Sequence, residues 1–152
     1  MDKNSKEMFG RGLTLLDIDV SSQEDFFNRI GQELYAHHLV KESFIQGIKQ
    51  REAKYPTGLP SFPYPVAIPH CDPEHVLVNS ISIVRFKKSI KFKEMGSMDK
   101  ELSVLFAFVL TIDGIQQVPV LKELMTLFMD EKFMNRLLTA NLNEVSELIG
   151  SL

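Results

Sequence analysis

The sequence predicts a mixed α/β protein of the α+β layered kind, in which helices cover both faces of a mixed β-sheet. Apolar residues recur at helical spacing toward both ends of the chain, whereas the middle, from Val76 to Leu110, alternates or is continuously apolar as strands are. Strands grouped between helices favour layers over a strictly alternating doubly wound fold. The 152 residues, 44% of them hydrophobic, fit one domain spanning 1–152.

The first third of the chain predicts two amphipathic helices. After a weakly alternating segment at 13–20, Ser21 stands three residues before Glu24 in a capping-box arrangement. The apolar residues that follow at helical spacing are Phe26, Phe27, Ile30 and Leu34. A second helix begins at about Lys41 and carries Arg51 at its C-terminal end.

A shaped loop is predicted for residues 55–69, which include five prolines. Proline lacks a backbone N–H, so neither a helix nor a central strand can run through the whole stretch. Only residues 66–68 are free to pair as a short strand, and that strand would deliver His70 at its exit. A loop residue at the end of a strand is a usual place for chemistry.

Three β-like runs follow at 76–86, 90–92 and 102–110, and the last is predicted to be a central strand because it is apolar almost without interruption. Beyond residue 114 the helical period returns. It predicts a helix over 118–128 and two shorter ones around 133–138 and 145–149.

Composition excludes several classes of partner. The 17 basic and 20 acidic residues give a net charge of −3 without any basic block, so nucleic acid and anionic membranes are poor candidates. The longest apolar run, 104–110, is too short for a spanning helix, which needs about 20 residues. Cys71 is the only cysteine and the polar residues 1–11 do not resemble a signal segment, so a cytoplasmic location is expected.

The densest cluster of reactive side chains contains His70, Cys71, Asp72, Glu74 and His75. It admits phosphoryl acceptance by a histidine, whose imidazole is a good nucleophile near neutral pH. A metal site is a second interpretation, although no second cysteine completes the paired spacing of structural zinc sites. A third is that Cys71 acts as a nucleophile activated by His75 across a turn. His70 as an ordinary half-buried histidine is the fourth interpretation, and the residues alone leave all four open.

The run Val66-Ala67-Ile68-Pro69-His70-Cys71, preceded by Arg51-Glu52 and Pro56-Thr57-Gly58-Leu59, resembles the active-site signature of a known family. This is the fructose/mannitol-type IIA family of the phosphoenolpyruvate-dependent sugar phosphotransferase system. The resemblance covers nearly the whole chain, and Pro69-His70-Cys71 followed by His75 is most similar to the galactitol-type IIA component. It implies the IIA fold of a mixed sheet sandwiched between helices. It also implies a phosphocarrier without metal or cofactor, in which His70 is phosphorylated by the phosphohistidine carrier protein and then attacked by a cysteine of the IIB component.

The resemblance also implies roles for neighbouring residues. Arg51 matches a family arginine beside the active histidine, and its forked donors suit phosphoryl oxygens. Gln117 stands where many mannitol-type members carry a second histidine, and it is able to donate a hydrogen bond but supplies no charge. His75 is interpreted either as a residue that orients His70 or contacts the phosphoryl group, or as a polar turn residue. Apart from the resemblance, the hydroxyls of Thr57 and Ser61 in the loop are expected to hydrogen-bond the phosphoryl group.

Two partners must dock in turn at His70, so a shallow and partly apolar surface is expected around it, with Phe62, Tyr64 and Val66 as contacts. Pro63 stands where the family commonly has a small residue, so this loop is expected to be shaped differently. The alternative function is a IIA-like regulatory module whose phosphorylation state controls a transcription factor or a transporter.

Overall fold

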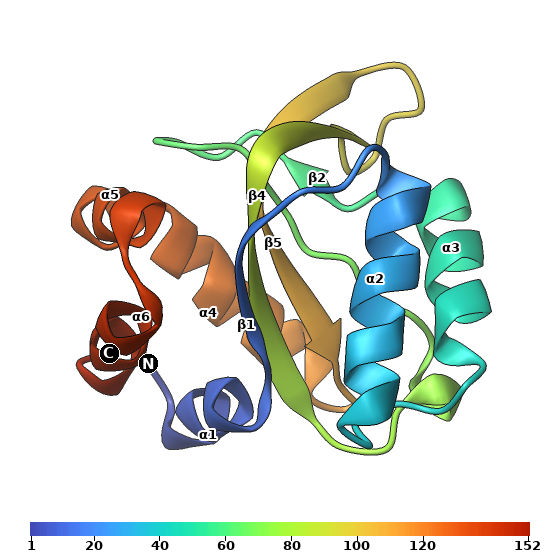
Figure 1. Cartoon of the computed structure of the whole chain (residues 1–152), viewed down its shortest axis with the longest axis horizontal. Coiled ribbons are helices and arrows are strands. Elements are labelled where there is room, and N and C mark those ends of the chain that lie inside the picture. Colours follow the sequence, from blue (N-terminus) through green and yellow to red (C-terminus); the bar gives the residue numbers. More distant parts are fainter.

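The computed structural model describes residues 1–152 and contains one five-stranded mixed sheet between two helical layers (Figure 1). The strands are β1 (Thr14–Ile18), β2 (Gly58–Leu59), β3 (Val66–Ala67), β4 (Ser80–Lys93) and β5 (Glu101–Thr111). The helices are α1 (Lys3–Arg11), α2 (Gln23–Ala36), α3 (Phe44–Lys54), α4 (Gln117–Phe128), α5 (Glu131–Thr139) and α6 (Leu142–Gly150), with a short 3₁₀ turn at Pro73–His75. The predicted fold class is confirmed. No helix combines the length and the apolar character needed to cross a membrane.

The strand order is β1-β4-β5-β3-β2, with an antiparallel β4–β5 pair at the centre and parallel pairs β1–β4 and β5–β3 on either side. Val66 pairs with Phe106 and Ala67 with Ala107, and an isolated bridge further along pairs His70 with Leu110. This register carries His70 to the C-terminal end of β5, where the chain turns toward α4.

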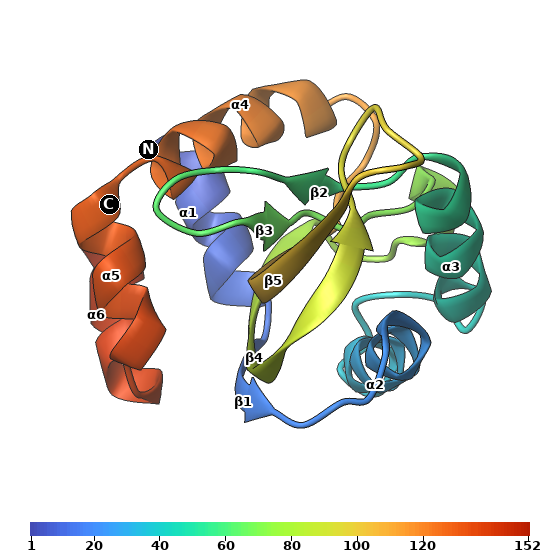
Figure 2. The ribbon, with the colours of Figure 1, turned by 90° about the horizontal axis from the view of Figure 1, so that it is seen from above.

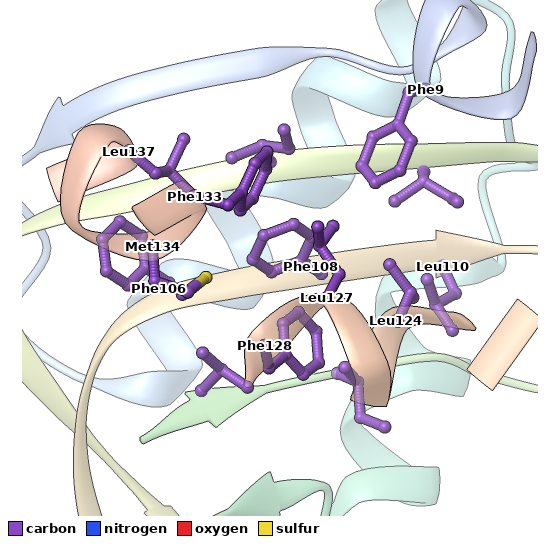
Figure 3. Close-up of a cluster of buried hydrophobic side chains, with 14 of the residues drawn as sticks. Phe9, Phe106, Phe108, Leu110, Leu124, Leu127, Phe128, Phe133, Met134 and Leu137 are labelled. Carbon is purple, nitrogen blue, oxygen red and sulfur yellow. The ribbon is translucent and has the colours of Figure 1, made fainter. Parts of the chain in front are cut away.

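Each face of the sheet has its own apolar core, because successive side chains of a strand point to opposite faces. Phe106 and Phe108 of β5 face α1, α4, α5 and α6, whereas Ala107 and Val109 face α2 and α3 (Figure 2). Figure 3 shows the first core, in which the rings of Phe108 and Phe128 lie 4.8 Å apart between centroids. Burial on both faces explains why residues 102–110 are almost continuously apolar.

Two helices differ from the prediction. Helix α1 lies in a segment that the sequence presents as polar, because only Met8 and Phe9 supply large apolar side chains to the core. Helix α2 is capped by Ser22, which accepts a hydrogen bond from the Asp25 N–H, while the hydroxyl of Ser21 binds the Asp25 carboxylate instead. The predicted capping residue was therefore one position too early.

Two strands also differ. Strand β4 runs unbroken from Ser80 to Lys93, and an irregularity in its pairing between Arg85 and Ile90 replaces the break expected between two runs. Strand β2 forms inside the proline-rich stretch, where only residues 66–68 were expected to pair. Between Pro56 and Pro60 there is room for a two-residue strand, since both prolines lie outside its hydrogen-bonded residues.

Arg85 connects the sheet to the helical layer that contains α5. Its Nε and Nη2 donate to the two carboxylate oxygens of Asp17 at 2.8 and 2.9 Å, and its Nη1 donates to the carbonyls of Leu137 and Ala140, both at 2.8 Å. These carbonyls end α5, so the buried guanidinium satisfies groups that the helix itself cannot pair.

Candidate active site

His70 is held by a hydrogen bond to its own strand. Its Nδ1 lies 2.7 Å from the carbonyl oxygen of Ile68, and since a carbonyl only accepts, Nδ1 carries the hydrogen. Nε2 forms no hydrogen bond within the protein and is not fully buried, although the whole residue is only 9% exposed. The neutral ring therefore offers the lone pair of Nε2 toward solvent.

The surroundings of His70 favour this neutral state. Burial lowers the pKa of His70 below its ordinary value, and the positive charge of Arg51 acts in the same direction. The hydrogen bond to Ile68 and the charge of Asp72 oppose the change without cancelling it. The imidazole is thus unprotonated at Nε2 near neutral pH, as a nucleophile must be.

Arg51 lies in the last turn of α3 and is fixed from two sides. Its Nη1 donates to Asp72 Oδ1 at 3.0 Å, and its guanidinium carbon lies 4.6 Å from the centre of the Tyr55 ring. Its Nε is buried without a hydrogen-bond partner. A guanidinium that lies near His70 and keeps unused donors is suited to bind an anionic group.

Both hydrogen-bond donors of Thr57 bind Glu52 rather than pointing toward a ligand. Its hydroxyl donates to Glu52 Oε1 at 2.6 Å and its backbone N–H donates to Glu52 Oε2 at 2.7 Å, with both residues buried. Burial raises the pKa of Glu52 to about 7 despite these two hydrogen bonds. The expectation that Thr57 donates its hydroxyl to a phosphoryl group does not fit this arrangement, because the hydroxyl proton is already used.

The buried contact between Glu52 and Thr57 is the feature of the candidate site that the sequence interpretation missed. A signal was present, since Phe44, Ile48 and Glu52 recur at intervals of four residues and all three are buried in the structure. A carboxylate on the inner face of a helix needs donors, and Thr57 supplies two of them.

His75 is engaged with the N-terminal half of α3. Its Nδ1 lies 2.8 Å from the hydroxyl of Ser43 and its Nε2 lies 3.6 Å from a carboxylate oxygen of Glu74. A Cβ on Gly47 would come within 2.7 Å of the imidazole, so glycine makes room for the ring. Both ring nitrogens thus face groups other than His70, which favours the interpretation of His75 as a turn residue.

Gln117 begins α4 at the same end of the sheet as His70, and its side chain forms no hydrogen bond. The preceding loop is fixed by Asp113, whose carboxylate accepts from Asn79 Nδ2 at 2.9 Å and from two backbone N–H groups of the loop. A Cβ on Gly114 would lie 3.7 Å from the ring of Pro73, so this loop borders the segment after His70. A role for Gln117 at the site stays a prediction.

Phe62, Tyr64 and Val66 do not surround His70. Tyr64 precedes His70 by six residues of extended chain, roughly 20 Å, and its hydroxyl donates to Asn135 of α5. Phe62 lines an apolar groove with residues near the end of α4, about one helix length from Gln117, and Val66 is fully buried. Figure 1 shows the β2–β3 loop leaving the upper end of the sheet. Phe62 and Tyr64 therefore lie toward the end of β3 that is remote from His70, and their contact with a partner stays a prediction.

Cys71 points into the core beneath α2 and α3, and burial raises the pKa of its thiol to about 12. A thiol of this kind is a poor nucleophile, so the interpretation of Cys71 as a nucleophile activated by His75 is not supported. No three side chains among His, Cys, Asp and Glu lie close enough together to hold a metal ion.

A family model described as the phosphoenolpyruvate-dependent sugar phosphotransferase system, EIIA 2, matches residues 7–151. The chain belongs to this family. Among curated EIIA proteins, the galactitol-specific EIIA component of Escherichia coli is 29% identical over 100 residues, which span 66% of this chain and 66% of that protein, just under two thirds.

Solved EIIA structures share the fold. Enzyme IIA for mannitol from Escherichia coli, in complex with phosphorylated enzyme IIB, gives a TM-score of 0.74 at 20% identity and covers 91% of this chain and 94% of that one. The nitrogen regulatory protein IIA-Ntr from Neisseria meningitidis gives 0.73 at 21% identity and covers 95% and 97%. The predicted family is confirmed, and at these identities the structures establish the fold.

Proposed function

We propose that this chain is a cytoplasmic phosphocarrier of a sugar phosphotransferase system. His70 accepts a phosphoryl group from a phosphohistidine carrier protein and passes it to a cysteine of a IIB component. The observation that carries the proposal is the state of His70, whose Nδ1 is tied to the Ile68 carbonyl while Nε2 stays free and unprotonated.

In the first transfer the lone pair of Nε2 forms a bond to phosphorus, and the bond from phosphorus to the donor nitrogen breaks, returning its electron pair to the donor. In the second, a cysteine thiolate attacks phosphorus and the pair of the Nε2–P bond returns to Nε2. The hydrogen on Nδ1 stays in place throughout, and its hydrogen bond to Ile68 stabilises the positive charge of the phosphorylated ring. Arg51 stabilises the phosphoryl oxygens, since such transfers depend on positioning and electrostatics.

Galactitol-type uptake is the transport role that the comparisons favour, because galactitol-specific EIIA components of Escherichia coli are among the curated proteins that this chain matches. The IIB partner is supported by the mannitol IIA structure, which contains phosphorylated IIB.

The second candidate function is a regulatory module that is phosphorylated at His70 without feeding a sugar. The similarity in fold to nitrogen regulatory protein IIA-Ntr favours it. Neighbouring genes for IIB and IIC components would favour transport, and transfer from the phosphorylated chain to a purified IIB cysteine would decide for it.

The test is incubation with phosphoenolpyruvate, enzyme I and the histidine carrier protein, followed by intact-mass spectrometry. The native chain is expected to gain one acid-labile phosphoryl group, and His70→Ala to gain none. His37→Gln is the matched control, because His37 is exposed at the end of α2 and should leave the gain intact. A native chain that gains no mass would overturn the phosphocarrier assignment.

A further inference from the structure

The hydrogen-bond ladder between β2 and β3 is left open where it approaches His70. Gly58 pairs with Ala67, so Thr57 lies opposite Ile68. In an antiparallel ladder, two residues in a hydrogen-bonded pair exchange both of their N–H···O bonds. Here the Ile68 N–H donates to the Thr57 carbonyl at 3.2 Å, but the Thr57 N–H does not donate back.

The missing bond is replaced by two others. The Thr57 N–H donates to Glu52 Oε2 at 2.7 Å, and the Ile68 carbonyl accepts Nδ1 of His70 at 2.7 Å. Glu52 thus draws away the backbone donor that the ladder would otherwise supply to the Ile68 oxygen. Nδ1–H of the His70 imidazole donates to this oxygen instead.

We propose that Glu52 is a positioning residue for phosphoryl transfer, which holds the Thr57 N–H so that the Ile68 carbonyl fixes His70 with Nδ1 protonated and Nε2 nucleophilic. The proposal rests on the function proposed above for His70. It assigns Glu52 no contact with the phosphoryl group.

The setting of Glu52 supports this role. Its other oxygen, Oε1, accepts a hydrogen bond from the Thr57 hydroxyl at 2.6 Å, so both oxygens of the carboxyl group are held by Thr57. Glu52 lies next to Arg51 on the last turns of α3, so one helix places a guanidinium near His70 and a carboxyl group against Thr57, which lies opposite Ile68. Elements of regular structure position such groups more accurately than loops do.

What the proposal requires of residue 52 is a hydrogen-bond acceptor of the right length. In Glu52→Gln, Oε1 can accept the Thr57 N–H and the amide can donate to the Thr57 hydroxyl oxygen. In Glu52→Met, the volume is filled but no acceptor remains, so the Thr57 N–H turns to the Ile68 oxygen. This oxygen has two lone pairs and is then shared by two donors, which weakens its hydrogen bond to Nδ1 of His70. Thr57→Val is the matched control, because it removes the buried hydroxyl contact but keeps the N–H donor on Glu52.

The first measurement uses the native protein. We expect a scalar coupling across the hydrogen bond from the Thr57 nitrogen to the side-chain carboxyl carbon of Glu52, and ¹⁵N shifts of His70 that report the Nδ1–H tautomer. A coupling from the Thr57 nitrogen to the Ile68 carbonyl carbon instead would overturn the proposal, whether or not any variant folds.

The variants then test the consequence. Glu52→Met should shift His70 toward the Nε2–H tautomer and slow phosphoryl acceptance by about three- to tenfold, the equivalent of one hydrogen bond, without changing the carrier concentration that gives half the maximal rate. Glu52→Gln and Thr57→Val should keep the native tautomer. An equal shift in Thr57→Val would show that any lost buried contact has this effect and would refute the role of Glu52. The tautomer is read without phosphorylation, so a native chain with the expected tautomer that accepts no phosphoryl group would refute the phosphocarrier function instead.

Discussion

Replacing Glu52 by Gln should change how the stability of the protein depends on pH. Burial raises the pKa of Glu52 from 4.5 to about 7 in the folded chain, so between these values the native state holds a proton that the unfolded chain has released. The stability contributed by the neutral carboxyl group is fully present below about pH 4.5 and is lost as the pH rises through about 7. One pKa unit corresponds to about 1.4 kcal/mol, so the loss amounts to roughly 3 kcal/mol.

Glutamine keeps the shape and both hydrogen bonds but has no proton to lose, so Glu52→Gln should lack this loss. The assay is urea unfolding of both proteins at several pH values from about 4.5 to 8. His70, whose pKa is lowered, contributes a slope of opposite sign. That slope is common to both proteins and cancels in their difference. The free energy of unfolding of the native chain should fall relative to the variant as the pH rises. Parallel curves would refute the argument that burial of Glu52 dominates over its hydrogen bonds to Thr57.

Three further perturbations test the site and its scaffold. His70 should titrate below 6.5 by NMR, and Arg51→Met should raise its pKa because a neighbouring positive charge is removed; an unchanged titration would place Arg51 away from the ring. Arg85→Met should lower the free energy of unfolding in urea by about 2 to 4 kcal/mol, since two carbonyls that end α5 lose their donor. Asp17→Asn should lower it by less than about 1 kcal/mol, because solvent screens the exposed carboxylate of Asp17. Cys71 should resist iodoacetamide in the folded protein and react in urea, since burial raises its pKa to about 12; rapid labelling of the native chain would contradict its burial.

The fold could be predicted where the period of apolar residues is long enough to be decisive. The run at 102–110 identified a strand covered on both faces, and the stripe over 118–128 identified α4. Helix α1 escaped because two large apolar residues in nine give too weak a period. Strand β2 was not predicted because two residues between prolines are too few to show a periodic pattern of apolar residues. Their pairing depends on β3 lying beside them.

The candidate site could be predicted only where a residue type is tied to its chemistry. His70 and Arg51 follow from the motif, and the structure places the guanidinium close enough to influence the imidazole. The partners of Thr57 could not be predicted, because a hydroxyl and an N–H in a loop can face either a ligand or a carboxylate. The choice is made by the pitch of α3, which brings Glu52 to the buried side five residues before Thr57.

On the function proposed above, a partner docks at His70, and the direction of β3 indicates which apolar surface we expect it to meet. Since this strand ends at His70, the segment that leaves β5 at the same end is well placed to supply exposed apolar residues beside the imidazole. Ile115 is 90% exposed there, on the loop that Asp113 holds rigid, and the exposed Val118 follows in the first turn of α4. An exposed isoleucine side chain on a loop that is held by hydrogen bonds is well placed for a partner.

We therefore expect Ile115→Ser to weaken binding of the histidine carrier protein by about tenfold, the effect of removing one well-buried contact residue. Phe62→Ser is the matched control, because Phe62 is also an exposed apolar residue, 69% exposed, but lies toward the opposite end of β3. Calorimetric titration of the carrier protein into each variant measures the difference. A larger loss in Phe62→Ser than in Ile115→Ser would mean that the partner also covers the groove at the end of α4, and that the direction of β3 does not decide where it docks.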